Sequence, residues 1–491
     1  DISLNTYLKS FALDLQVTVE NLETIKVLLN TLTSIDDVMN TANLIFSPEM
    51  TSIIFSTHKL NSDSGLIKSW LHRATLYITK IFAEKSEEYL TTEFVAFLSC
   101  LRESLDASMW KFVAKNMINS QLEVIFSRPW VKNVDVLKYC TWIVQTGSKN
   151  VIESIKLVNI LLTNENNVFF WNSRDEEAKY YTAMILSFLF QMNIKQLCSY
   201  NLVFKLVKMY RGTGSASDLV LKDLLMHIEN ENGQSWVQYV SNWDFVDDWG
   251  SGNAATGMDV PELVIDTPGV SDSLTVNLHK SIIEHTIRLF NPLSHSVRMV
   301  ELEKTIISQK QDFKKIENFY ELKKMDAEEL EHTVVYDIEF ILLLIVNNDD
   351  LFKITEDSIE VNIRALIDAQ LLQLVICGLA HEVSTVVEIS KRIISSVMLT
   401  IEQDIKKIDE KKETKESSNE DKQIIASTFK ERSAFKVYLG NLLYSYEVKK
   451  QAKISGEENV EAMPKLFIMM LSYLVPILAN PGHFLYERAY R

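Results

Sequence analysis

Glycine and proline are scarce in this sequence, with 13 glycines and 8 prolines among 491 residues. A sheet-rich domain or a set of phosphate-binding loops needs more of the positive-φ turns that glycine supplies, whereas an array of helices needs few. Apolar residues make up 47% of the chain and charged residues 24%, so most of it can bury a core. The composition therefore favours an all-α protein.

Cysteine and net positive charge are also limited. The four cysteines lie far apart, without a CxxC pair or a nearby histidine cluster, and indicate neither a zinc site nor a disulfide framework. The net charge is −16, whereas a protein that wraps nucleic acid along its length is usually basic, because its affinity comes from neutralising phosphates. The charge argues against broad coating of nucleic acid and leaves room for local basic patches. The cysteines, which we expect to be reduced and buried, are Cys100, Cys140, Cys198 and Cys377.

The sequence offers no segment for a membrane. The most apolar run, residues 467–479, is too short to span a bilayer and contains Pro476. No signal peptide opens the chain. It begins with Asp1 rather than Met and stops at Arg491 inside a segment that reads as helix. We therefore expect a fragment of a larger intracellular protein.

The motifs of several enzyme classes are missing. Residues 263–270, LVIDTPGV, resemble the Asp-x-x-Gly element of a GTPase, but the chain has neither a GxxxxGK[ST] phosphate loop nor an Asn-Lys-x-Asp guanine reader. Asp266–Gly269 is interpreted as a Pro-Gly turn. His381 begins an HExxH pattern that lacks its second histidine, and no GxSxG occurs. The sequence predicts no catalytic residue, no metal site, no cofactor and no small-molecule substrate.

Helical periodicity recurs almost everywhere. The apolar positions of residues 3–15 and of residues 65–82 fall on single stripes, and residues 177–192 are apolar nearly all round. The last segment is expected to lie between two layers of helices. Paired helices of this kind usually stack as an α-solenoid, and the absence of a fixed sequence period favours an irregular, HEAT- or armadillo-like array.

Composition shifts divide the chain into segments. Residues 406–422 contain no aromatic residue; we expect a flexible linker there, with a solvated helix extension as the alternative. The expected segments are helical repeats at 1–248, a long Gly/Ser/Asp-rich loop at 249–275, further helical repeats at 276–405, the charged linker at 406–422 and C-terminal helices at 423–491.

Two stretches combine basic and aromatic residues, a pattern that can contact RNA phosphates and stack bases. They are residues 195–211 and 429–453. The alternative is that the aromatic residues belong to the core and the lysines are merely solvated. The candidate RNA-contact residues are Lys195, Lys205, Lys208, Arg211, Lys430, Arg432, Lys436, Lys449 and Lys450.

A group of tryptophans and one aspartate are further candidates for a structural or binding role. Three tryptophans, Trp236, Trp243 and Trp249, lie close together before the long loop; they either pack the base of that loop or form a docking surface for a partner. Asp337 precedes a strongly apolar segment and is positioned to cap the helix that follows.

Four stretches in this order resemble the C-terminal part of the nucleolar pre-ribosomal-associated protein one family, also called unhealthy ribosome biogenesis protein one. In that family a Trp-Gly element precedes a Tyr-Asp-Pro-x-Phe segment, and a Pro-x-His-x-Leu-Tyr pattern follows near the end. Ile338 stands where the family favours proline, and the leucine-rich continuation of the family is missing. The matching stretches are residues 242–255, 334–348, 384–398 and 474–491, with Trp249-Gly250, Tyr336-Asp337, Phe340, Pro481, His483, Leu485 and Tyr486 at the motif positions.

The resemblance implies a large, non-enzymatic α-solenoid scaffold of the nucleus and nucleolus. Such a scaffold acts in early pre-60S particles, where it holds pre-rRNA and other assembly factors, including a DEAD-box helicase module. The alternatives are a helical-repeat adaptor or nuclear transport receptor unrelated to ribosome assembly, and an enzyme whose site is assembled in space. Purification with pre-ribosomal particles favours the first, cargo-dependent binding the second, and a deep pocket with converging ionisable groups the third.

Overall fold

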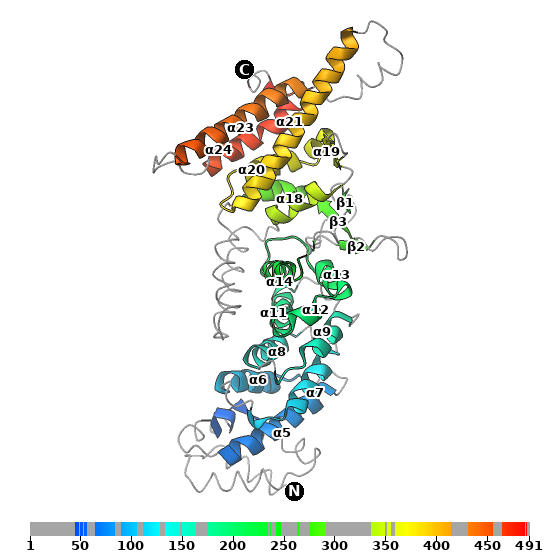
Figure 1. The fold of residues 1–491 in the computed structure, drawn as a ribbon. Helices are drawn as coiled ribbons and strands as arrows, with labels where there is room; N and C mark the ends of the chain where they lie inside the picture. The colour runs from blue at the N-terminus through cyan, green and yellow to red at the C-terminus, as the bar shows by residue number, and fades with distance from the viewer. Residues whose placement is uncertain are drawn as a thin grey trace. The chain divides into compact units, whose positions relative to one another are not determined.

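The fold is predominantly helical, in agreement with the all-α class expected from composition (Figure 1). The structure is a computed structural model. It describes residues 45–48, 50–52, 54–55, 64–83, 90–105, 111–127, 133–147, 150–163, 175–233, 236, 242–246, 263–265, 274–290, 335–348, 351–354, 359–413, 431–454, 464–486 and 488.

The described chain divides into two compact units. The first unit holds the described residues up to Leu206 together with 220–233, and the second holds 207–219 together with the described residues from Trp236 onward. The helices α13 and α14 contribute residues to both. The helices up to this point are α5 (Ser64–Ala83), α6 (Thr92–Ser104), α7 (Lys115–Phe126), α8 (Val134–Thr146), α9 (Ser154–Thr163), α11 (Glu176–Met192), α12 (Ile194–Leu197), α13 (Tyr200–Met209) and α14 (Ala216–Asn232).

Within the first unit, the helices α5 to α9 and α11 pack mainly on the helix after next. Helix α5 contacts α7, which contacts α9, while α6 contacts α8, which contacts α11 (Figure 1). Helix α11 also packs on α9, and its side chains from Ala178 to Phe190 are all buried. The all-round apolar character of this segment is therefore explained by neighbours on two sides.

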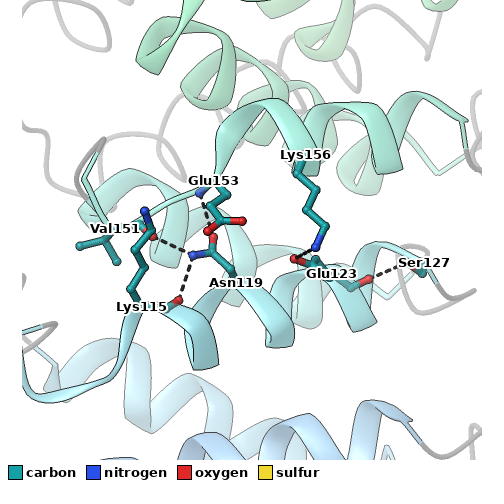
Figure 2. Close-up of polar contacts among 7 residues, drawn as sticks. All are labelled: Lys115, Asn119, Glu123, Ser127, Val151, Glu153 and Lys156. Atoms are coloured by element: carbon teal, nitrogen blue, oxygen red, sulfur yellow. Dashed lines mark hydrogen bonds and ion pairs between the residues drawn. The ribbon is translucent and has the colours of Figure 1, made fainter.

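A buried asparagine joins α7 to the start of α9 (Figure 2). The Asn119 side chain is 2% exposed. Its amide nitrogen donates to the carbonyl oxygens of Lys115 (2.9 Å) and Val151 (2.8 Å), and its amide oxygen accepts from the backbone N–H of Glu153 (2.8 Å). The Val151 carbonyl and the Glu153 N–H lie just before α9, where the helix supplies no hydrogen-bond partner for them. The Asn119 side chain supplies a partner for both.

Replacing Asn119 with leucine is expected to lower the free energy of unfolding of the first unit by about 2–3 kcal/mol. The change removes three hydrogen bonds and leaves the Val151 carbonyl and the Glu153 N–H without these partners. Chemical denaturation followed by circular dichroism measures the loss. Lys156→Ala is the control, because it removes only the ion pair between Lys156 and Glu123 (2.6 Å), and surface pairs contribute little. An equal loss in both variants contradicts the assignment.

The second unit contains two small sheets and a group of helices. Strands β1 (Asn242–Val246) and β3 (Leu274–His279) pair in parallel, and β2 (Leu263–Ile265) pairs antiparallel with β3. Strands β4 (Phe352–Ile354) and β5 (Ile359–Val361) form an antiparallel pair. The helices are α15 (Lys280–Arg288), α18 (Ile338–Asn347), α19 (Ile363–Asp368), α20 (Leu371–Gly378), α21 (Ser384–Glu413), α23 (Arg432–Ile454), α24 (Lys465–Ser472) and α25 (Leu474–Leu478).

Helix α20 is the centre of the second unit's helical group. All its residues from Leu371 to Gly378 are buried, and it packs on α15, α18, α19, α21 and α24. Helix α21 packs in turn on α18, α23 and β5. A helix with apolar residues on every side needs neighbours on every side, and α20 has them.

Some residues differ from the expected segments, including those of β1, β4 and β5, which lie where helical repeats were expected. Residues 263–265 and 274–275, expected within the long loop 249–275, belong to strands β2 and β3, where Val, Ile and Thr favour extended backbone. Residues 406–413, expected at the start of a flexible linker, continue α21, because Lys and Glu are good helix formers even when solvated. Residues 414–422 lie outside the described residues.

Candidate nucleic-acid interface

The first candidate surface lies on α12 and the first turns of α13, within the first unit. Lys195, on α12, is exposed, and Lys205, on α13, is partly exposed. Tyr200 opens α13 and is 48% exposed. These side chains sit on helices that anchor through Leu197, Leu202 and Leu206, which are buried.

The aromatic side chains of this surface are stacked. The rings of Tyr200 and Phe204 lie 6.1 Å apart between centroids, with an interplanar angle of 12°. The four-residue spacing places both residues on one face of the helix. Phe204 is only partly buried, so the pair lies at the surface rather than in the core.

The stretch of sequence that carries this surface holds lysines and no acids. Residues 178–206 contain no aspartate or glutamate, in a chain of net charge −16. One carboxylate of α14 lies nearby: burial raises the pKa of the Cys198 thiol, and Glu231 adds to that rise. Along residues 178–206 the lysines thus have no acidic sequence neighbour, while Glu231 of α14 partly opposes their charge.

The other two candidates of residues 195–211 belong to the second unit. Lys208 is partly buried, and desolvation lowers its pKa. Arg211 is 8% exposed, so its guanidinium cannot reach a phosphate without local rearrangement. Its contact with RNA stays a prediction that the described geometry does not favour, whereas Lys195 and Lys205 of the first unit are exposed or partly exposed.

The second candidate surface, on α23, contains paired charges. The Lys436 ammonium lies 3.2 Å from Glu402, and Arg432 lies near Asp404, where it lowers a carboxyl pKa that burial raises. Exposed pairs contribute little, so they do not prevent a contact with phosphate. Lys449 and Lys450 lie on α23, in a part whose side chains the structure does not describe, and Lys430 lies outside the described residues.

The tryptophans proposed for docking differ in their placement. Trp236 is 4% exposed and stacks on Phe340, with centroids 6.0 Å apart and an interplanar angle of 14°. Its ring therefore belongs to the core, as in the alternative in which the tryptophans pack the base of the long loop. Trp243 lies on β1, where side chains are not described, and Trp249 lies outside the described residues.

Asp337 begins α18 as its N-cap, which confirms the prediction from sequence. Its carboxylate accepts the N–H of Glu339 (3.1 Å) and the hydroxyl of Tyr210 (3.0 Å), and its own N–H donates to the carbonyl of Gly212 (2.7 Å). The carboxylate thus joins two segments that are far apart in the sequence. Ile338, where the resembled family favours proline, is the first residue of the helix, a position that suits proline because no intrahelical bond is lost there.

Tyr336 extends this anchor on the other side. Its ring is 1% exposed, its hydroxyl accepts the N–H of His279 (3.0 Å), and its N–H donates to the hydroxyl of Thr286 (2.9 Å). Residues 336 and 337 therefore tie β3, α15, α18 and the turn after α13 together. Both residues match the motif of the resembled family, and both are buried. Their role in the described structure is to hold these elements together.

An exposed apolar face on α24 was not predicted from the sequence. Leu466, Met470 and Tyr473 lie at spacings of four and three residues and are 81%, 57% and 43% exposed. The apolar run 467–479 was visible in the sequence, but its pattern does not say which side faces water. Apolar side chains that gather on one exposed face are typical of interaction surfaces.

Two thiols in the described residues are deeply buried. Burial raises the pKa of Cys377 to about 12 and also raises the pKa of Cys140, so both thiols are protonated at neutral pH. No group of three or more His, Cys, Asp or Glu side chains in the described ranges is placed to hold a metal ion. None of the helices described has the length and apolar character needed to cross a bilayer.

The described chain is thus a helical protein with exposed lysine and aromatic side chains on α12 and α13 and an exposed apolar face at α24. A family model described as nucleolar pre-ribosomal-associated protein 1 matches residues 372–491. Nucleolar pre-ribosomal-associated protein 1 of Saccharomyces cerevisiae is 26% identical over 447 residues, which cover 87% of this chain and 24% of that protein. No solved structure matches the chain.

These comparisons confirm the resemblance to the nucleolar pre-ribosomal-associated protein 1 family. The yeast alignment covers 87% of this chain and so extends well beyond the four stretches, between residues 242 and 491, that carried the resemblance in the sequence. The chain spans about a quarter of the length of the yeast relative. The name of that relative agrees with the nuclear and nucleolar localisation that the resemblance implied.

Proposed function

We propose that this chain is part of a non-enzymatic scaffold that acts in the nucleolus during early assembly of the large (60S) ribosomal subunit. The observation that carries the proposal is the agreement of the family match at residues 372–491 with the long alignment to the yeast relative. Both bear the description of a nucleolar protein associated with pre-ribosomes. A role in ribosome biogenesis follows from that description for the relative, and we extend it to this chain.

The packing of the first unit supports a scaffold rather than a catalyst. Its helices contact neighbours in sequence order, α5 to α7 to α9 and α6 to α8 to α11. We propose that these two rows are part of an irregular, HEAT- or armadillo-like α-solenoid. Stacked helix pairs offer long surfaces to partners because each repeat exposes its outer face.

The proposed partners are large-subunit pre-rRNA and other ribosome assembly factors, including a DEAD-box helicase module. For pre-rRNA, the described surface with the most suitable chemistry is that of Lys195 and Lys205, where acids are scarce. Lysines at such a surface hold phosphates by charge and do not read sequence. This surface therefore positions RNA that is selected elsewhere.

Co-sedimentation tests the proposal. A tagged form of the protein, expressed in its own cells, is fractionated on a density gradient and its RNA is crosslinked by ultraviolet light and sequenced. We expect the protein in the fractions of large-subunit precursors, with crosslinks to large-subunit pre-rRNA. Recovery outside the nucleus, or in complexes that contain cargo and no pre-rRNA, contradicts the proposal and favours an adaptor or transport receptor.

Charge reversal of the double variant Lys195→Glu and Lys205→Glu is expected to weaken RNA binding most strongly at low salt. Each lost phosphate contact makes the negative slope of log K against log salt less steep by about 0.7 for single-stranded RNA. Fluorescence anisotropy of labelled RNA at several salt concentrations measures the slope. The control is the double variant Lys115→Glu and Lys353→Glu, which changes the charge equally at two exposed lysines elsewhere. Equal slopes in the two double variants remove the surface of α12 and α13 from the proposed interface.

A further inference from the structure

The geometry of α13 points to a binding site for an unpaired RNA base on the ring of Tyr200. This inference rests on the proposed function, and it names the form of RNA that this surface takes. The site consists of Lys195, Tyr200, Phe204 and Lys205, all within the first unit.

Tyr200 is exposed at the start of a helix whose inner face is buried. Large aromatic side chains usually lie mostly in the core, yet Tyr200 keeps 48% of its surface accessible. Its aromatic ring has a flat π-face. A base has such a face too, and stacking on an aromatic ring is tolerant of sequence because every base has one.

The Tyr200 ring is held in place by a neighbouring ring. Phe204 stacks against Tyr200 with ring planes 12° apart, and a ring held by a neighbour loses less rotamer freedom on binding than a lone one. The stack is thus arranged before any ligand arrives. A site ordered in advance loses less entropy when it binds.

Lysines accompany the two rings in the sequence. Lys195 and Lys205 flank the ring along the chain, and residues 178–206 hold no acid. The combination of stacking rings and nearby lysines is the one that single-stranded RNA sites use, with rings for bases and cations for the backbone. In a duplex the base faces are already stacked on each other, so a duplex can use the lysines and not the ring. The site therefore discriminates in favour of unpaired RNA.

The experiment uses the purified 491-residue chain and two labelled RNAs of equal length, a single strand and a hairpin duplex, in fluorescence anisotropy. We expect tighter binding of the single strand. Tyr200→Ala should weaken its binding roughly five- to 150-fold and leave the weaker duplex binding within about twofold. Tyr200→Phe keeps the π-face and should bind within about twofold of the unchanged chain.

A second measurement reports stacking directly. A single strand that carries 2-aminopurine should lose fluorescence when it binds the unchanged chain and the Tyr200→Phe variant, and should keep it with Tyr200→Ala. Because Tyr200 is exposed, circular dichroism should be the same for all three proteins. Equal binding of single strand and duplex, unchanged binding in Tyr200→Ala, or the absence of quenching each overturns the inference.

Failure of the base site is distinguishable from failure of the scaffold role. If the chain co-sediments with pre-ribosomal particles while Tyr200→Ala binds RNA as before, the base site is wrong and the scaffold stands. If Tyr200→Ala instead releases a protein from those particles and leaves RNA binding unchanged, the ring contacts a protein and the inference is likewise wrong. If the unchanged chain prefers single strands through Tyr200 yet never co-sediments, the scaffold role fails and the base site stands.

Discussion

Substitution of Gly212 by alanine is expected to destabilise the second unit by about 2–5 kcal/mol. Gly212 has φ +69, a left-handed backbone that costs a residue with a Cβ about 1–2 kcal/mol. A Cβ at this position also overlaps the ring of Phe340, and overpacking of a core adds about 1–3 kcal/mol. The two terms act together because the glycine makes the turn and Phe340 packs against it.

Gly233 supplies the matched control for this prediction. It has nearly the same backbone, φ +68, but a Cβ there meets nothing within 4 Å. Gly233→Ala should therefore show only the backbone term of about 1–2 kcal/mol. Native-state hydrogen exchange of the α18 amides reports on the second unit and that of the α14 amides on Gly233, since one global free energy is not defined for two units. Equal losses of free energy in Gly212→Ala and Gly233→Ala would mean that Phe340 moves aside for the new methyl group and that no overpacking occurs.

The helices were predictable from the sequence because their apolar residues recur with the period of a helix. Asp337 was predictable as a cap because capping depends on a carboxylate and the backbone N–H groups that follow within one turn. Strand β2 was not, since its three residues carry too short a pattern and its pairing with β3 joins separate parts of the chain. The extension of α21 through Glu413 was equally ambiguous, because a charged helix and a charged linker have the same composition.

The candidate surfaces were predictable only as segments. A stretch of lysines and aromatic residues on a helix does not say which side faces water, and the structure separates its members accordingly. Tyr200 is half exposed, whereas Tyr210, ten residues later, is 1% exposed and donates to Asp337. That hydrogen bond spans 127 residues, and no local pattern records a partner so distant. Arg211 was grouped with the lysines for the same reason, although it is buried.

Substitution of Asp337 by alanine is expected to lower the free energy of unfolding of the second unit by about 2–5 kcal/mol. The change removes the cap of α18, which contributes about 0.5–2 kcal/mol. It also leaves the buried Tyr210 hydroxyl without its acceptor, and a hydrogen bond to a charged group contributes about 1.5–3 kcal/mol. Asp337→Asn should lose less, because its amide oxygen can still accept the Glu339 N–H while its NH2 group donates to the Tyr210 hydroxyl oxygen in place of the bond that the hydroxyl donated to the carboxylate.

A double-mutant cycle separates these two terms. Tyr210→Phe alone removes the hydroxyl and leaves the carboxylate buried at 4% exposure, so it should destabilise the unit. In the Asp337→Ala background the same change should have a smaller effect, since no acceptor is left, and the difference should be about 0.5–3 kcal/mol. Hydrogen exchange of the α18 amides again supplies the free energies. Additive effects would mean that the two side chains act independently, and that Asp337 stabilises α18 through its cap alone.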